Sequence, residues 1–253
     1  QNVAAGSQLD IFAEPTILLS QHDHRYTWYN AHLSSAGGEV NDPIVFNIPA
    51  NYDYCDMSDT RLSLTGKITG SNGEDLVGEA QVAPVNMFLH AFIKDLEVKI
   101  GQQLLPLIPS NNLYAWKAGI ETLLNYGKDA KSSSLNGIMF YKDDCQHMNT
   151  TNPTENSGLL QRWTLTHGSQ MFQVCGPLHF GLFHQERYMI NNVPLQILIN
   201  RNQATLFLTA NDGVNYRFIL TSAKVGLRTV KIADGIRLAH EEALKFSNAK
   251  YIY

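Results

Sequence analysis

"TRLSLTGKIT", residues 60–69, alternates apolar and polar side chains at the period of a β-strand. Leu62, Leu64 and Ile68 share one face, which is typical of a strand with one side buried in a core. "DLEVKI" (95–100) repeats this alternation and is followed by a predicted turn at Gly101. The two segments predict antiparallel sheet with one face against a core.

Further strand-like segments follow along the chain: "MFQVCGPLHFGLF" (171–183), "PLQILIN" (194–200), "TLFLT" (205–209), "VNYRFILTS" (214–222) and "AKVGLRTVKI" (223–232). "NDG" (211–213) separates two of them and predicts a hairpin, because Asn, Asp and Gly tolerate positive φ. Eight or more strands with short turns predict an all-β sandwich or barrel.

One helix is predicted near 113–126, within "YAWKAGIETLLNYGKDAK" (114–131). Ser110 or Asn111 can cap its start, and Gly127 stands where a left-handed residue ends many helices. Its apolar side chains recur at helical spacing: Leu113, Trp116, Ile120, Leu123 and Leu124.

A second helix is predicted near 235–246, within "DGIRLAHEEALKF" (234–246), where Asp234 can cap the start. One side carries Ile236, His240, Ala243 and Phe246. Each helix has one apolar stripe, so we expect both to lie on the β domain with the stripe packed against it. This arrangement predicts structural supports and not ligand sites.

Composition bounds the class of protein. The chain has 253 residues, 44% hydrophobic and 17% charged, and no repeat or linker divides it, so a single folded domain is predicted. No stretch approaches the roughly 18 apolar residues of a membrane span, so none is expected. Three scattered cysteines, Cys55, Cys145 and Cys175, argue against a disulfide framework and fit a reducing compartment.

Net charge is −4, and the first 24 residues contain no Lys or Arg. A basic arm that neutralises nucleic-acid phosphates is therefore missing from this stretch. We expect no direct nucleic-acid binding.

Motifs that carry chemistry are incomplete. "HDH" (22–24) could chelate a metal, but no second close cluster completes a tetrahedral site, so a polar loop is expected. "HEEAL" (240–244) has Leu244 where a zinc-protease helix needs its second His. Cys145 and His147 lie in a polar, loop-like neighbourhood, and phosphate-binding loops are absent. We expect no catalytic, cofactor-binding or metal-binding residues, no cofactor, and no enzymatic activity.

Two alternatives stay open on residues alone. A cupin-type metal enzyme would need His179 and His184 to join a carboxylate, but no HxH-plus-Glu pattern links them. Aromatic, turn-flanked segments such as "RYTWYN" (25–30) and "NYDY" (51–54) favour an assembly or binding protein instead.

Five blocks in order resemble a viral family. They are "VNMFLHAFIKDLEVKIGQQL" (85–104), "YAWKAGIETLLNYGKDAKSSSL" (114–135), "FYKDD" (140–144), "FHQERYMINNVPLQI" (183–197) and "LAHEEALKFSNAKY" (238–251). They are similar to the first half of the major capsid protein of Polinton/Maverick elements and adintoviruses. The resemblance covers residues 84–251 well and 20–83 loosely, where "DMSDTRLSLTGKIT" (56–69) fits.

The resemblance implies an eight-stranded antiparallel jelly-roll sandwich with two flanking α-helices, from the adenovirus-hexon lineage. In that lineage two jelly rolls stand side by side and three chains form a pseudo-hexagonal capsomer. The helix at 114–126 then corresponds to an insertion on the flank of the first roll, and the helix at 234–246 precedes the connection to the second. We expect one jelly-roll domain over 1–253, with 1–24 an extended arm and the second roll absent from this chain.

The function implied is a structural capsid protein that forms capsomers of an icosahedral shell by lateral contacts. Its partners would be its own copies, in trimeric or six-fold capsomers, and other capsid proteins. Its location would be the virion, assembled in the host nucleus or cytoplasm. The alternative is a jelly-roll binding module, a minor capsid or vertex protein or host-adapted descendant, which recognises a protein or carbohydrate.

Overall fold

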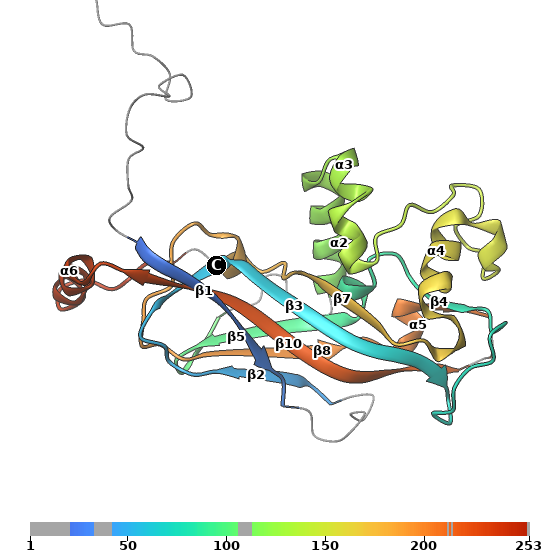
Figure 1. The fold of residues 1–253 in the computed structure, drawn as a ribbon, viewed down its shortest axis with the longest axis horizontal. Coiled ribbons are helices and arrows are strands. Elements are labelled where there is room, and N and C mark those ends of the chain that lie inside the picture. The colour runs from blue at the N-terminus through green and yellow to red at the C-terminus, as the bar shows by residue number, and fades with distance from the viewer. Residues whose placement is uncertain (1–20, 33–41, 106–112, 212, 214, 252–253) are drawn as a thin grey trace, which may run out of the picture.

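The computed structural model describes residues 21–32, 42–105, 113–211, 213 and 215–251. Two four-stranded antiparallel sheets pack against each other around one core (Figure 1). The first sheet has the order β1 (Gln21–Asn30), β10 (Tyr216–Ile232), β3 (Tyr54–Gly70) and β7 (Phe172–Pro177). The second has the order β2 (Ile44–Ile48), β8 (Leu195–Arg201), β5 (Ile93–Ile100) and β6 (Gln103–Leu104). A small two-stranded sheet pairs β4 (Val82–Pro84) with β9 (Leu208–Ala210).

The pairing of the eight main strands is nested. The outermost pair is β1 with β10, followed inward by β2 with β8, β3 with β7 and β5 with β6. Successive pairs alternate between the two sheets, so the chain forms one long hairpin that is rolled into a sandwich. This is the strand order of a jelly roll, and it confirms the predicted eight-stranded antiparallel sandwich.

The strand at 60–69 has the buried face that its sequence predicts. Leu62, Leu64 and Ile68 of β3 are fully buried, and Leu96 and Val98 of β5 lie in the same core. The two sheets therefore supply one apolar layer each, as in other sandwiches.

Five phenylalanines close one end of this core. Phe88 lies at the centre, with ring centroids of Phe92, Phe172, Phe207 and Phe218 between 5.1 and 6.0 Å from its own. Most of these pairs meet edge to face, which aromatic rings favour. The cluster fixes the short helices α1 (Phe88–Ala91) and α5 (Ala204–Phe207) against β7 and β10.

The predicted hairpin across 211–213 is wrong. Residues 205–207 belong to helix α5, and β9 pairs with β4. The two strands predicted at 214–222 and 223–232 are one strand, β10. Its two edges are occupied by β1 and β3. A strand has only two edges, so none remains for β9.

The structure also corrects the interpretation of the segment before residue 31. "HDH" (22–24) belongs to strand β1 and not to a polar loop, and the aromatic segment "RYTWYN" (25–30) is the rest of the same strand. The ring of Tyr26 lies on Gly226 of β10, where a β-carbon would come within 2.4 Å of it, so this position needs glycine. Residues 1–20 of the predicted arm (1–24) lie outside the described residues, and its last four residues are part of β1.

The two predicted helices are confirmed as α2 (Tyr114–Asn125) and α6 (Asp234–Leu244). Their predicted ends differ. The N-cap of α2 is Leu113, and Ser110 and Asn111 lie outside the described residues. Gly127 has φ of −72° and begins the short helix α3 (Lys128–Lys131), so it is not a left-handed stop. Asp234 follows the N-cap Ala233 and forms an ion pair with Arg237 at 3.2 Å.

Helix α4 (Ser157–Thr166) had no signal in the sequence analysis. The side chain of Asn156 caps it by accepting hydrogen bonds from the N–H groups of Gly158 and Leu159. Single 3-10 turns complete the described elements: η1 (Ser134–Ile138), η2 (Pro153–Glu155), η3 (His167–Ser169) and η4 (Gly181–His184).

The buried guanidinium of Arg162 holds α4 to the sandwich. It donates hydrogen bonds to the carbonyl oxygens of Pro84 and Tyr141 at 2.8 and 3.0 Å, and to Asp143 Oδ1 at 2.8 Å. In Figure 1, α2, α3 and α4 lie toward one end of the sandwich, and α6 extends from the other.

Cys55, Cys145 and Cys175 are all free, as predicted. Among the described helices, none has the length and apolar content to cross a bilayer.

Candidate functional site

Helix α2 leaves its large apolar side chains exposed. Trp116 is 71% exposed and Leu124 is 79% exposed, and Ile120 and Leu123 are also exposed. The prediction that this stripe packs on the β domain is therefore wrong. The uncovered stripe is the first candidate interaction surface.

The face of α2 that does pack is small and partly polar. Its buried residues are Tyr114, Ala118 and Thr122. Tyr114 Oη accepts a hydrogen bond from the backbone N–H of His179 at 3.1 Å, and Thr122 Oγ1 lies 3.4 Å from His179 Nε2. Hydrogen-bond partners on the sandwich thus allow a polar face to be buried, which leaves the apolar face to solvent.

Helix α6 is largely exposed, with only Ile236 and Arg237 partly covered, so the predicted buttress is wrong here as well. None of its residues is buried, and Phe246, just beyond its end, is 88% exposed. It contacts the sandwich through Tyr54 Oη, 2.9 Å from His240 Nδ1, and through Arg237, whose guanidinium lies 4.5 Å from the ring centroid of Tyr52. Figure 1 shows α6 beyond the end of β10.

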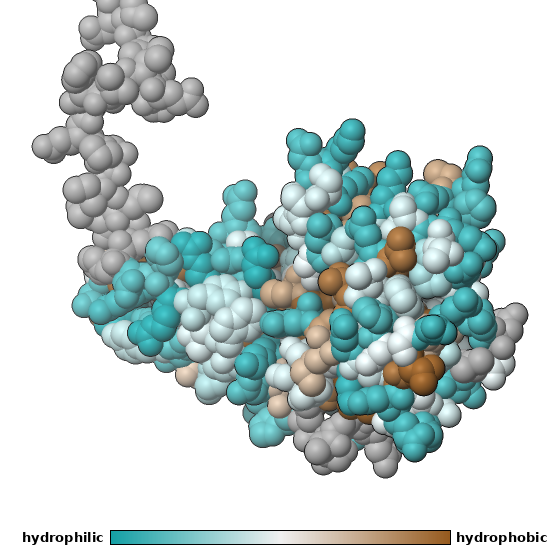
Figure 2. Space-filling model, turned by 45° about the vertical axis from the view of Figure 1, so that its right-hand side comes forward, coloured by the Kyte–Doolittle hydropathy of each residue, from teal (hydrophilic) through white to brown (hydrophobic). Residues whose placement is uncertain are grey.

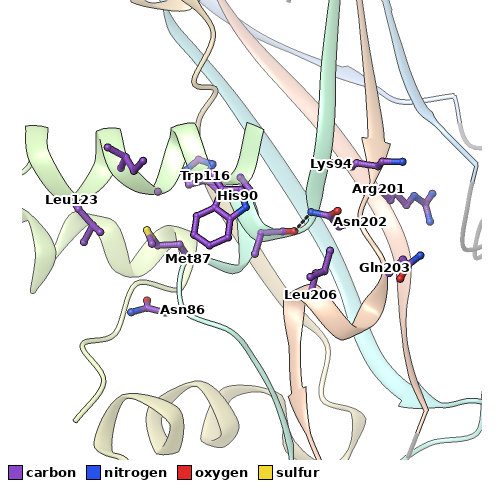
Figure 3. Close-up of a pocket in the computed structure, with 14 residues that line it drawn as sticks. Asn86, Met87, His90, Lys94, Trp116, Leu123, Arg201, Asn202, Gln203 and Leu206 are labelled. Carbon is purple, nitrogen blue, oxygen red and sulfur yellow. Dashed lines mark hydrogen bonds between the residues drawn. The ribbon is translucent and has the colours of Figure 1, made fainter. Parts of the chain in front are cut away.

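A groove of about 680 Å³ runs between α2 and the α1–α5 side of the molecule (Figure 3). One wall is apolar and comes from α2, with Trp116, Ile120 and Leu123. The other carries polar side chains around the end of β8, including Arg201, Asn202 and Gln203 (Figure 3). The remaining lining residues are Asn86, Met87, His90, Ala91, Lys94, Ala115, Gly119 and Leu206.

Asn202 keeps the polar wall in place. Its Nδ2 group donates hydrogen bonds to the carbonyl oxygens of Ala91 at 2.8 Å and Ile93 at 3.3 Å. Its backbone N–H donates to the carbonyl oxygen of Phe92 at 2.8 Å. These bonds tie the end of β8 to α1 and the start of β5.

His90 lies beneath the groove and is only 1% exposed. Among the described residues, neither of its ring nitrogens has a hydrogen-bond partner. Its ring packs edge to face on that of His179, with centroids 4.7 Å apart, and lies 6.2 Å from that of Tyr114. Desolvation, with a smaller effect of His179, lowers the pKa of His90 from 6.5 to about 3.

The buried His90 predicts that the fold weakens as pH falls. Below pH 6.5 the unfolded chain binds a proton at His90, but the folded chain does not until about pH 3. Folding stability should therefore fall by on the order of 1 kcal/mol per pH unit in this window because of His90 alone. Chemical denaturation between pH 7 and 5 should show a steeper loss in the wild type than in His90→Leu. Equal slopes for the two proteins would contradict the prediction.

Three side chains that could bind a metal ion lie close together, and one of them is on α2. The ligand atoms of Glu121, His179 and His184 all lie within 4.8 Å of one another. His179 is buried, Glu121 is half-buried and His184 is exposed, so the cluster extends from the core to the surface. Glu121 Oε2 lies 2.7 Å from His179 Nδ1.

Burial sets the charge state of this cluster. Desolvation lowers the pKa of His179 and of His184 below the usual value, although Glu121 opposes the shift in both. Both imidazoles are therefore neutral at neutral pH, and the contact between Glu121 and His179 is a hydrogen bond donated by Nδ1–H.

No local sequence pattern joins His179 and His184 to a carboxylate. Glu121 comes from a helix 58 residues before His179, and no local pattern links the two. His24 is exposed in β1, and Cys145 and His147 are exposed in turns before α4.

On the face shown in Figure 2, hydrophobic residues form small separate patches among polar ones. Exposed large apolar residues of the described chain include Trp116, Leu124, Leu206, Leu238 and Phe246, which lie on or beside α2, α5 and α6.

Comparison with known proteins gives distant relatives. No protein-family model matches the chain. An uncharacterized protein of Caenorhabditis elegans is 27% identical over 200 residues, which are 76% of this chain and 45% of that protein. The chain therefore spans less than half the length of this relative.

Three solved structures similar to this chain come from viruses. A chain of the Sputnik virophage has 15% identity and a TM-score of 0.49, with 92% of this chain and 53% of that chain covered. The Faustovirus major capsid protein has 8% identity and a TM-score of 0.48, with 92% and 58% covered. The mavirus major capsid protein has 13% identity and a TM-score of 0.43, with 90% and 50% covered. At these values the jelly-roll assignment rests on the nested strand pairing of the chain itself.

Proposed function

We propose that this protein is a structural capsid protein whose jelly roll forms capsomers of an icosahedral shell by lateral contacts. The observation that carries the proposal is the outward apolar face of α2 on a sandwich whose own core is complete. Exposed apolar side chains grouped on one element are typical of surfaces that another protein covers.

The strand order and the five resembling blocks support a more specific form of the proposal. The chain is the first jelly roll of a double jelly-roll major capsid protein of the Polinton/Maverick (adintovirus) type. A second roll, other copies in trimeric or six-fold capsomers, and other capsid proteins are its partners. It acts in the virion, without catalysis and without direct contact to nucleic acid.

Trp116 is the expected centre of the lateral contact. Tryptophan is the residue most enriched at binding hot spots, and its loss from one costs about 2 kcal/mol or more. Because Trp116 is 71% exposed, Trp116→Glu should leave the fold intact. We expect this change to weaken self-association about 30-fold or more.

Mass photometry and native mass spectrometry over a concentration series measure this effect, with electron microscopy of the particles. The chain is tested alone and with any downstream part of its reading frame. Met148→Glu is the matched control, since Met148 is 65% exposed and lies on a turn outside α2. The proposal is supported if the wild type forms trimers, hexamers or shells, Trp116→Glu weakens these assemblies, and the Met148→Glu protein still forms them. The proposal would be overturned if the protein were monomeric at every concentration, both alone and with any downstream part of its reading frame.

The groove beside α2 favours a second candidate, a jelly-roll binding module for a protein or carbohydrate. Its volume of about 680 Å³ is in the range of ligand sites, and an apolar wall facing a few polar groups is their usual composition. A monomer that retains a small ligand through native mass spectrometry would favour this candidate over the capsid protein.

A further inference from the structure

We infer that Glu121, His179 and His184 form a binding site for a divalent transition-metal ion, with Zn²⁺ as the best fit. Two imidazole nitrogens and one carboxylate oxygen are a donor set that Zn²⁺ takes in proteins, with water in the fourth position. The site is independent of the proposed capsid role. It departs from the sequence-based expectation of no metal ligands.

The distances in the cluster suit a site that closes on an ion. Bond lengths of about 2.0–2.2 Å in a tetrahedral zinc site place ligand atoms about 3.3 Å apart. Glu121 Oε2 and His179 Nδ1 are already 2.7 Å apart, and no pair of ligand atoms exceeds 4.8 Å. His184 is the exposed member at the end of η4, so rotation of its side chain can bring the third ligand in.

The surroundings of His179 prepare it for an ion. Zn²⁺ binds the neutral form of an imidazole. When Nδ1 binds the ion, its proton is lost and Nε2 takes one up, so the ring changes tautomer without changing charge. Thr122 Oγ1, 3.4 Å from Nε2, can then accept a hydrogen bond from Nε2–H. Ligating histidines usually have such a partner on the second nitrogen.

Neighbouring groups also define where the ion can enter. His90 packs on one side of His179 inside the core, and Lys117 Nζ lies 3.8 Å from Glu121 Oε1. The open side is therefore that of His184. An ion at this position would join α2, which supplies Glu121, to η4, which supplies His184.

The test is metal binding to the purified full chain. The probes are Zn²⁺, followed by isothermal titration calorimetry, and Co²⁺, followed by its visible absorption. The parent protein and all variants carry His24→Ala, so that His22 and His24 of β1 cannot chelate the ion as a pair. We expect one equivalent of Zn²⁺ per chain and tetrahedral Co²⁺ bands, with affinity that falls as pH is lowered.

His184→Ala and Glu121→Gln should each weaken binding at least about tenfold. Both positions reach solvent, so neither change should unfold the chain, and far-UV circular dichroism without metal checks this. His147→Ala, at an exposed histidine outside the cluster, should bind as tightly as its parent. Zn²⁺ should also raise the Tm of the parent and not that of His184→Ala. Failure to bind Zn²⁺, or binding that both His184→Ala and Glu121→Gln retain unchanged, would overturn the inference.

Discussion

Replacing Phe88 with alanine is expected to lower the free energy of unfolding by about 3–5 kcal/mol, the usual range for a buried phenylalanine. Phe88 is fully buried and its ring meets four others within 6.0 Å. The removed ring leaves a cavity among α1, α5 and the strands β7 and β10. Because the interior around it is close-packed, we do not expect the site to close by a small backbone shift.

Urea or guanidinium unfolding at equilibrium, followed by tryptophan fluorescence and circular dichroism, measures this loss. Phe246→Ala is the matched control, because Phe246 is 88% exposed and its removal should change little. Phe88→Leu should lie between the two, since it refills most of the volume. A Phe88→Ala protein as stable as Phe246→Ala would show that the phenylalanine cluster does not hold the roll together.

Replacing Asp143 with alanine is expected to lower the free energy of unfolding by about 3 kcal/mol. The change leaves the guanidinium of Arg162 buried without its counter-charge, and breaking a buried pair from one side costs about 3–5 kcal/mol. The lower end applies here, because the carbonyl oxygens of Pro84 and Tyr141 still accept hydrogen bonds from Arg162.

The loss should be local before it is global. Helix α4 is joined to β4 and to residues 141–143 through Arg162, so amide hydrogen exchange in α4 should accelerate in Asp143→Ala before that of β3 or β10. Glu242→Ala is the control, since it removes an exposed ion pair with Lys245 that contributes little. If α4 is as protected in Asp143→Ala as in Glu242→Ala, the pair does not hold this helix.

Local sequence patterns predicted β3 and β5 from their alternating side chains but missed β1 and β2. In β3 and β5 the period of two identifies both the strand and its buried face, because a core lies on one side only. In β1, "QHDHRY" (21–26) has almost no apolar residues, so its pairing with β10 had no local signal. This strand is determined by its pairing with β10, which lies near the other end of the chain.

For the helices, local sequence patterns predicted where they lie in the chain but not how they pack. Helical periodicity located α2 and α6 but assigned the wrong face of α2 to the core. The face that packs contains Tyr114 and Thr122, whose hydrogen-bond partner His179 is more than 50 residues away. The cluster of Glu121 with the two histidines escaped detection for the same reason, since its members meet only after the roll closes.

The nested pairing also sets the order in which this protein can fold. The innermost pair, β5 with β6, closes across a two-residue turn, but β1 must wait for β10 some 200 positions later. Such distant contacts slow folding, because a long loop is ordered before its ends meet. During synthesis we therefore expect the edges of β1 and β3 that pair with β10 to stay open until residue 232 has emerged, and we expect chaperones to bind the nascent chain at this stage.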